Sequence, residues 1–266
     1  MIRDITLGQY YPANSVLHRL DPRVKLVATL VYVISLFLFQ SFTGYIVATV
    51  FLVSIIALSH VPVRFIFKGL KAVFILLIIT AILNVFLTPG RELVSFWKIT
   101  ITIEGVKLAA FMMIRLVYLI IGSSIMTLTT TPSSLTDGLE KGLGWMKFMK
   151  VPVHEIAMMM SIALSFIPIL MEETDKIIKA QQARGADFES GNLIKRARAL
   201  VPILVPLFVS AFRRANDLAL AMESRCYRGG EGRTKLHPLK YKKRDVIAYL
   251  ILLAYLAAII TVGIIF

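Results

Sequence analysis

The final segment of the chain, residues 246–266, contains no charged residue. It reads VIAYLILLAYLAAIITVGIIF. A helix of about 20 apolar residues crosses the hydrocarbon core of a bilayer, and lipid admits little besides helices and closed barrels. Hydrophobic residues make up 57% of the whole sequence, which exceeds what a water-soluble core needs. We therefore expect an all-α polytopic membrane protein whose last helix covers residues 246–266.

Four more apolar runs lie in the first half of the chain and predict an N-terminal membrane domain over residues 1–128. Asp21 and Pro22 stand before the first run, where they supply a helix N-cap and a first-turn proline. Together with the last helix, the runs predict about five membrane-crossing helices. The four runs cover approximately Val24–Phe39, Tyr45–Ser59, Ala72–Leu87 and Val106–Leu128.

The distribution of basic residues predicts the orientation. They gather around the start of the first run and between the second and third, whereas the link 41–44 has none. These residues are Arg3, Arg19, Arg23, Lys25, Arg64, Lys68 and Lys71. Because cytoplasmic loops carry an excess of Lys and Arg, we expect a multi-pass protein of the cell (inner) membrane with a cytoplasmic N-terminus. The same rule explains the net charge of +14 without nucleic acid as a partner.

Residues 129–245 hold 19 of the 30 Lys and Arg residues and therefore predict a domain on the cytoplasmic side. Three helical stretches are expected in it. One is short and covers about Ser133–Met149, and two are long and cover about 153–184 and Asn192–Tyr227. The predicted architecture is thus five crossing helices plus a cytoplasmic-side domain of three helices.

The two long helices are expected to continue from an apolar part into a charged one that protrudes into the cytosol. Their apolar parts, residues 156–171 and 199–212, fall short of the roughly 20 residues of a span. The alternative is that both cross as short spans. That alternative would put the basic segment 172–198 outside the cell, against the usual distribution of positive charge.

Both long helices are predicted to end in the same way. Residues 180–185 read AQQARG and residues 221–226 read AMESRC, so a small residue precedes an arginine in each. A basic residue in the last turn complements the helix dipole, but that role does not require the same frame twice. Two similar exposed tips predict two similar receptors. The tip residues are Ala183, Arg184, Gly185, Ser224, Arg225 and Cys226.

These features resemble the transmembrane T component of energy-coupling factor (ECF) transporters, the family that includes cobalt- and vitamin-uptake systems. Residues 8–26, GQYYPANSVLHRLDPRVKL, are similar to the opening motif of that family. The stretch from TTTPSSLTDGLEKGL to VPVHEIAMMMSIALSFIPILMEETDKIIKAQQARGADF, residues 129–188, resembles its most distinctive region. The likeness covers almost the whole chain.

The resemblance implies a non-catalytic coupling subunit of an ATP-driven importer of a vitamin or a transition-metal ion. Its partners would be two ABC-type ATPase subunits, which hydrolyse ATP, and one membrane substrate-binding (S) subunit. Arg184 and Arg225 match the two Ala-Arg-Gly-type motifs that dock onto the ATPases. Ser224 and Cys226 stand where that family more often has alanine and glycine.

Methionines are concentrated ahead of the first tip. Six of the 11 methionines fall in residues 146–171. They either fill a core or form an adaptable contact surface, since unbranched methionines repack against different partners. We expect such a surface to contact the S subunit, together with residues 199–212. The six are Met146, Met149, Met158, Met159, Met160 and Met171.

No catalytic, cofactor or metal site is expected. Residues 232–234, GRT, lack the lysine of a P-loop, and Met158 stands where a zinc-protease helix starting at His154 needs its second histidine. Cys226 is the single cysteine. A self-sufficient secondary carrier or channel is the alternative function and would need ionisable residues at the membrane midplane. Arg115 is one such residue, for which a structural role is the simpler expectation, with Asn84 as one possible partner.

Overall fold

The computed structural model describes residues 10–39, 41–96, 99–186, 188, 192–230 and 238–265. Contacts between residues divide the chain into two compact units. Residues 8–142 and 239–266 form one unit, called here the bundle. Residues 143–238 belong to the other, called here the paired-helix unit. The prediction of an all-α polytopic membrane protein is confirmed, apart from one β-hairpin in the bundle.

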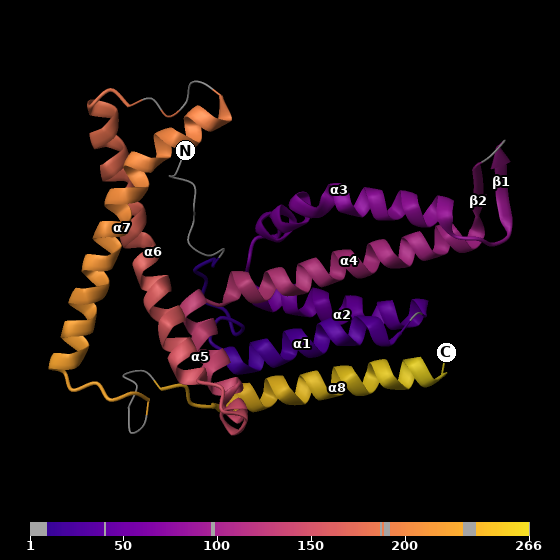
Figure 1. Cartoon of the computed structure of the whole chain (residues 1–266). Helices are drawn as coiled ribbons and strands as arrows, with labels where there is room; N and C mark the ends of the chain where they lie inside the picture. Colours follow the sequence, from indigo (N-terminus) through magenta and orange to yellow (C-terminus); the bar gives the residue numbers. More distant parts are fainter. Residues whose placement is uncertain are drawn as a thin grey trace. The chain divides into compact units, whose positions relative to one another are not determined.

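Long helices lie side by side in the bundle (Figure 1). α1 contacts α4, α5 and α8, while α3 packs along α4 and α2 packs on α8. The short helix α5, which the sequence placed in the domain of residues 129–245, thus packs on the first membrane helix. The bundle helices are α1 Pro22–Leu38, α2 Phe42–Ser59, α3 Val63–Leu87, α4 Ile103–Thr129, α5 Pro132–Gly142 and α8 Lys243–Ile265.

Two boundaries differ from the sequence prediction. α3 begins at Val63 instead of about Ala72, because the basic residues there do not interrupt the helical spacing of apolar ones, and Ile66 is fully buried. The segment between the predicted runs Ala72–Leu87 and Val106–Leu128 contains a hairpin, which the sequence analysis did not predict. Its strands β1 (Glu92–Phe96) and β2 (Ile99–Thr102) pair antiparallel, in keeping with their β-branched composition.

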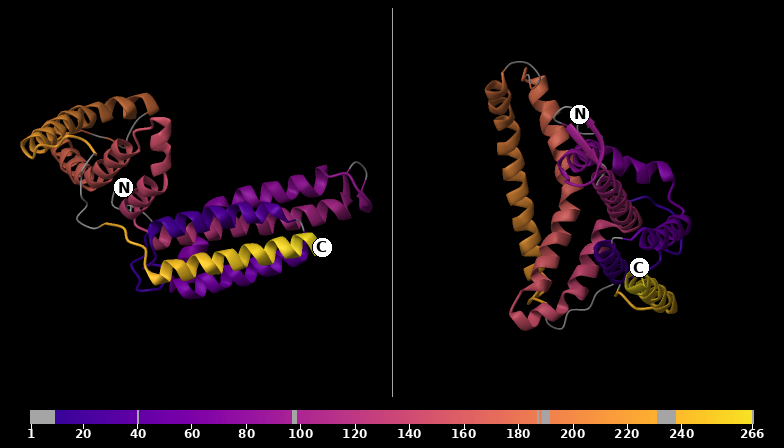
Figure 2. Two further views of the ribbon diagram at one scale, coloured as in Figure 1. Left: turned by 90° about the horizontal axis from the view of Figure 1, so that it is seen from below. Right: turned by 90° about the vertical axis from the view of Figure 1, so that its right-hand side faces the viewer.

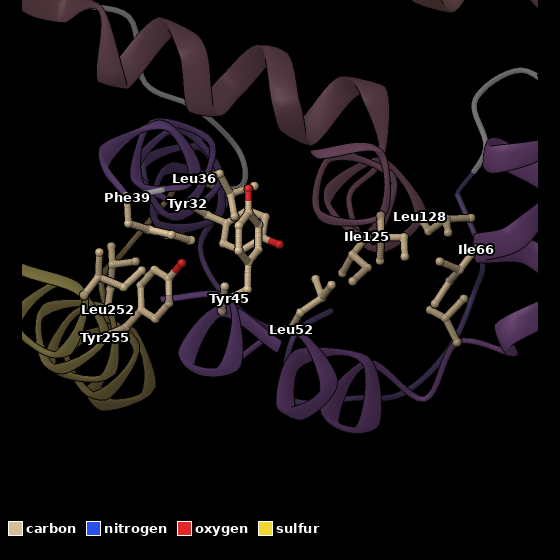
Figure 3. Packing of buried hydrophobic residues seen from close by; sticks show 14 residues of the cluster. Tyr32, Leu36, Phe39, Tyr45, Leu52, Ile66, Ile125, Leu128, Leu252 and Tyr255 are labelled. Carbon is tan, nitrogen blue, oxygen red and sulfur yellow. The ribbon is translucent and has the colours of Figure 1, made fainter. Parts of the chain in front are cut away.

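Aromatic and aliphatic side chains from α1, α2, α3, α4 and α8 fill the core of the bundle (Figure 3). The rings of Phe51 and Tyr255 stack with centroids 4.0 Å apart. The Tyr255 hydroxyl lies 2.9 Å from the Ser35 hydroxyl, so its polar end has a partner within the apolar core, as buried tyrosines require. The labelled residues are Tyr32, Leu36, Phe39, Tyr45, Leu52, Ile66, Ile125, Leu128, Leu252 and Tyr255.

The N-terminal motif joins the ends of three bundle helices. Asp21 is the N-cap of α1, as predicted, and its carboxylate accepts from the Arg23 amide at 3.0 Å. The Asp21 amide in turn donates to the Asp245 carboxylate of α8 at 2.9 Å. The buried Lys25 ammonium donates to the Thr129 carbonyl at the end of α4 at 2.8 Å. These contacts give the motif a structural role.

The paired-helix unit consists of a 3₁₀-helix, η1 (Gly144–Met149), and two long helices, α6 (Val153–Ala183) and α7 (Leu193–Ser224). The predicted helix 133–149 is therefore split between α5 and η1. α6 and α7 run antiparallel along each other (Figure 2). The ends of α6 contact opposite ends of α7, since Gln181 reaches Pro202 and Met158 reaches Tyr227.

Five helices in the described part of the chain are long and apolar enough to cross a membrane. They differ from the predicted five, because α6 and part of α7 qualify, whereas α1 has only 17 residues and is not among them. α3 adds a sixth when its two parts, which meet at a 59° bend, are taken together. The length and composition of α6 and α7 are thus compatible with helices that cross the membrane. Such a crossing remains the alternative to their predicted placement on the cytoplasmic side.

Candidate docking site

The first tip closes α6 with a Schellman motif. The Gly185 amide donates to the Gln182 carbonyl and the Ala186 amide donates to the Gln181 carbonyl, both at 3.0 Å. This pair of bonds satisfies carbonyls that a helix end otherwise leaves without donors. Gly185 has a φ of 85°, a left-handed conformation that glycine adopts without steric cost. Arg184, the residue before it, is exposed.

The second tip repeats this arrangement at the end of α7. The Cys226 amide donates to the Glu223 carbonyl at 2.8 Å, and the Tyr227 amide donates to the Met222 carbonyl at 3.0 Å. Cys226 takes the place of Gly185 and has a φ of 55°. The similarity of the two sequence frames is therefore a similarity of backbone conformation, and the exposed Arg225 holds the same position as Arg184.

The two tips lie at opposite ends of the pair of long helices (Figure 1). This follows from the antiparallel packing, because each tip is the C-terminal end of its helix. The predicted protrusion of both charged ends into the cytosol stays a prediction, and it now has to be reconciled with tips at opposite ends of the pair. Because Gln181 contacts Pro202 and Met158 contacts Tyr227, about 25 helical residues separate the tips, which is roughly 35–40 Å at a rise of about 1.5 Å per residue. Such a distance suits two separate receptors.

The loop after the second tip folds back onto the start of α6. The Tyr227 hydroxyl lies 3.1 Å from the Met158 sulfur. A Cβ atom on Gly230 would lie 2.4 Å from the His154 ring, so only glycine fits that position without displacing the histidine. The sequence analysis did not predict that this loop packs on α6. The pair Gly229-Gly230 was the signal that could have indicated it.

The six methionines do not form a single face. Met149, Met159 and Met160 are exposed, whereas Met158 contacts Tyr227 and is half-buried like Met146 and Met171. A more continuous apolar surface lies on α7, within the predicted range 199–212. Spacings of three and four residues place its members along one side of the helix. The exposed residues of this stripe are Val201, Leu204, Val205, Phe208, Val209 and Phe212.

Comparison with known proteins assigns the chain to a family. The family model described as "Cobalt transport protein" (CbiQ) matches residues 13–236, which include both tips. The chain belongs to this family, the T components of ECF transporters.

Three relatives extend the match to the whole sequence, and each bears the name "Energy-coupling factor transporter transmembrane protein EcfT". The protein of Clostridium kluyveri is 58% identical over 94% of this chain and 93% of its own length. That of Ruminiclostridium cellulolyticum is 50% identical over the full length of both chains. That of Lactococcus lactis is 45% identical over 92% of each. This T component is thus a membrane transporter subunit.

Arg115 of the T component has a structural environment. Its guanidinium donates to the Phe39 carbonyl at 3.3 Å and lies over the Phe37 ring at 5.3 Å. Since Phe39 is the C-cap of α1, the cation meets the negative end of that helix dipole. The predicted contact with Asn84 is wrong, because the Asn84 amide donates to Thr80 within α3.

Among the described residues of the T component, no three or more His, Cys, Asp or Glu side chains form a group that could hold a metal ion. Residues 232–234, which the sequence analysis compared with a P-loop, lie outside the described residues.

Proposed function

We propose that this T component is the non-catalytic coupling subunit of an ATP-driven ECF importer and that its two tips dock onto two ABC-type ATPase subunits. The observation that carries the proposal is the repeated Schellman ending with an exposed arginine at Arg184 and Arg225. A guanidinium offers a planar fork of donors that suits carboxylates or carbonyls in a groove. ATP hydrolysis belongs to the partners.

Because the tips lie at opposite ends of the helix pair, the orientation of α6 and α7 relative to the membrane decides whether both tips can reach cytoplasmic ATPases. Helices that crossed the bilayer antiparallel would expose one tip on each side. Both tips are cytoplasmic only if α6 and α7 lie along the membrane face. The positive-inside distribution, which also favours a cytoplasmic N-terminus, supports that placement through basic residues near the start of α7, such as Arg198.

The S subunit is proposed to contact the exposed apolar stripe of α7 together with Met159 and Met160 of α6. Approach and separation of the two ATPases would tilt α6 and α7 and reorient the bound S subunit. The transported compound is then a vitamin or a transition-metal ion recognised by the S subunit. The carrier or channel alternative gains no support from Arg115, whose charge is already engaged by the end of α1.

Charge reversal at the tips tests the docking role. Arg184→Glu and Arg225→Glu should each weaken retention of the ATPases on the tagged T component, and the double variant should abolish both retention and uptake. Arg213→Glu is the matched control, because Arg213 is an exposed arginine of α7 away from both tips. Normal recovery of the ATPases with the double variant would refute the proposal.

A further inference from the structure

η1 presents three large apolar side chains outward from a single short turn. Phe148 is 96% exposed, Trp145 67% and Met149 62%. At about 2 Å per residue, the six residues of η1 extend too little to cross a bilayer. Their exposure therefore has a different origin from that of the lipid-facing residues of long membrane helices.

Backbone hydrogen bonds order this turn. The Met146 amide donates to the Leu143 carbonyl at 2.9 Å, and the Val151 amide donates to the Met146 carbonyl at 3.4 Å. Lys150 closes the turn with a left-handed φ of 59°. The apolar side chains thus project from a defined backbone and pay little entropy on insertion into a partner surface.

Within η1 and at its end the charge is of one sign, and the nearest acidic residues in the sequence are Glu140 and Glu155. Residues 143–154 contain Lys147 and Lys150 but no Asp or Glu, and Lys150 is exposed. Trp side chains favour the membrane–water interface, where their rings lie at headgroup level. Lysines beside them are attracted to anionic lipid headgroups. A protein partner would need acidic residues placed opposite these lysines, whereas an anionic leaflet offers negative charge over its whole surface.

We propose that η1 is an interfacial membrane anchor of the paired-helix unit. Trp145, Phe148 and Met149 insert at the boundary between the headgroups and the acyl chains of an anionic leaflet, and Lys150 contacts the headgroups. The anchor fixes the start of α6, and with it the neighbouring second tip, at the membrane surface.

Tryptophan fluorescence of the full chain tests this anchor. The sequence has two tryptophans, so Trp97→Phe leaves Trp145 as the single reporter, and Trp97→Tyr provides a second background if the first folds poorly. Each protein is reconstituted in phosphatidylcholine vesicles with or without phosphatidylglycerol. We expect blue-shifted emission, strong quenching by lipids brominated near the top of the acyl chain, and weak quenching by aqueous acrylamide.

Two variants make the result specific. Quenching by brominated lipids should be stronger in vesicles with phosphatidylglycerol than in those without it, and Lys150→Gln should reduce this difference. Phe148→Ser should shift the emission of Trp145 toward that of a tryptophan in water. Free access of acrylamide without quenching by brominated lipid would overturn the proposal. Shielding from both quenchers that occurs only when the other transporter subunits are present would also overturn it, because η1 would then contact protein.

Discussion

The side-chain amide of Gln181 donates a hydrogen bond to the carbonyl of Pro202, with a nitrogen–oxygen distance of 3.3 Å. Within α7 that carbonyl would normally accept from the residue four positions later, which is Pro206 and has no N–H. α6 thus supplies the donor that α7 lacks. The carbonyl of the same Gln181 accepts from Ala186 in the first tip, so one residue joins the tip to the neighbouring helix.

This relationship predicts a coupling between two substitutions. Gln181→Met removes the donor while keeping a long side chain, and should destabilise the α6–α7 pair by about 0.5–1 kcal/mol, the net value of an exposed neutral hydrogen bond. Pro206→Ala restores the helical N–H, so Gln181→Met should cost close to nothing in that background. A double-mutant cycle of unfolding free energies in detergent measures the difference.

Gln182→Met is the matched control for this cycle. Gln182 is the exposed neighbour whose backbone carbonyl, like that of Gln181, serves the first tip. Its substitution should have the same small effect with or without Pro206. Equal costs for Gln181→Met in both backgrounds would show that the bond to Pro202 does not compensate for the proline.

The left-handed residue at each tip predicts opposite effects for two small substitutions. Cys226 carries a side chain at φ 55°, whereas Gly185 at φ 85° has open space around its missing Cβ. A left-handed conformation costs a non-glycine residue about 1 kcal/mol. Cys226→Gly should therefore stabilise the second tip and Gly185→Ala should destabilise the first by about that amount.

Hydrogen exchange of the tip amides measures these effects. Protection of the Tyr227 amide should rise in Cys226→Gly, and protection of the Ala186 amide should fall in Gly185→Ala. Cys226→Ser serves as the control, because it keeps the side chain and the strain. Loss of protection in Cys226→Gly would mean that the thiol, and not the backbone, maintains the second tip.

Arg115 is predicted to act as a cap on α1. Arg115→Met leaves the Phe39 carbonyl without its charged donor, so amides in the last turn of α1 should exchange about fivefold faster for each 1 kcal/mol lost. Arg115→Lys retains a cation and should show a smaller change. Asn84→Leu should leave α1 unaffected, since Asn84 bonds within α3. Exchange unchanged by Arg115→Met would refute the capping role.

Sequence patterns predicted the local features of this fold well and the pairings between distant segments poorly. Asp21 and Pro22 marked the start of α1 because capping depends on neighbouring residues, and the Arg-Gly frame marked the first tip for the same reason. The direction in which α6 and α7 pack, and hence the distance between tips, depends on a loop and on contacts such as Gln181–Pro202. No local pattern contains that information.

Polar residues in the membrane region show the same limit. Arg115 was recognised as needing a partner, but both Asn84 and the end of α1 were available to a charge in α4. The structure selects the helix end because a carbonyl at the C-cap of α1 lacks an intrahelical donor. The hairpin 92–102 was missed because its strands have only five and four residues. Segments this short carry too little alternation of apolar and polar residues to predict a strand.

His18 predicts a loss of stability on acidification. Its Nε2 donates to the Tyr11 carbonyl at 2.9 Å, and its Nδ1, 2.7 Å from the Ser15 hydroxyl, accepts from it. Burial lowers the pKa of His18 below its ordinary value of 6.5, and the nearby Lys25 charge acts in the same direction, while the bond to Tyr11 opposes them. The folded protein therefore binds a proton less readily than the unfolded chain.

A depressed histidine pKa contributes stability that is present above the unfolded value and is lost as the pH falls below it. The Tm in detergent should fall as the pH is lowered from about 8 to about 5, with the decline beginning near the ordinary pKa. His18→Gln should lower the Tm at high pH but flatten this decline, because the titrating group is gone. His60→Asn removes a nearby group that also lowers the pKa of His18, and asparagine tolerates the left-handed backbone there, so this variant should flatten the decline only slightly. An undiminished decline in His18→Gln would assign the acid sensitivity to other groups.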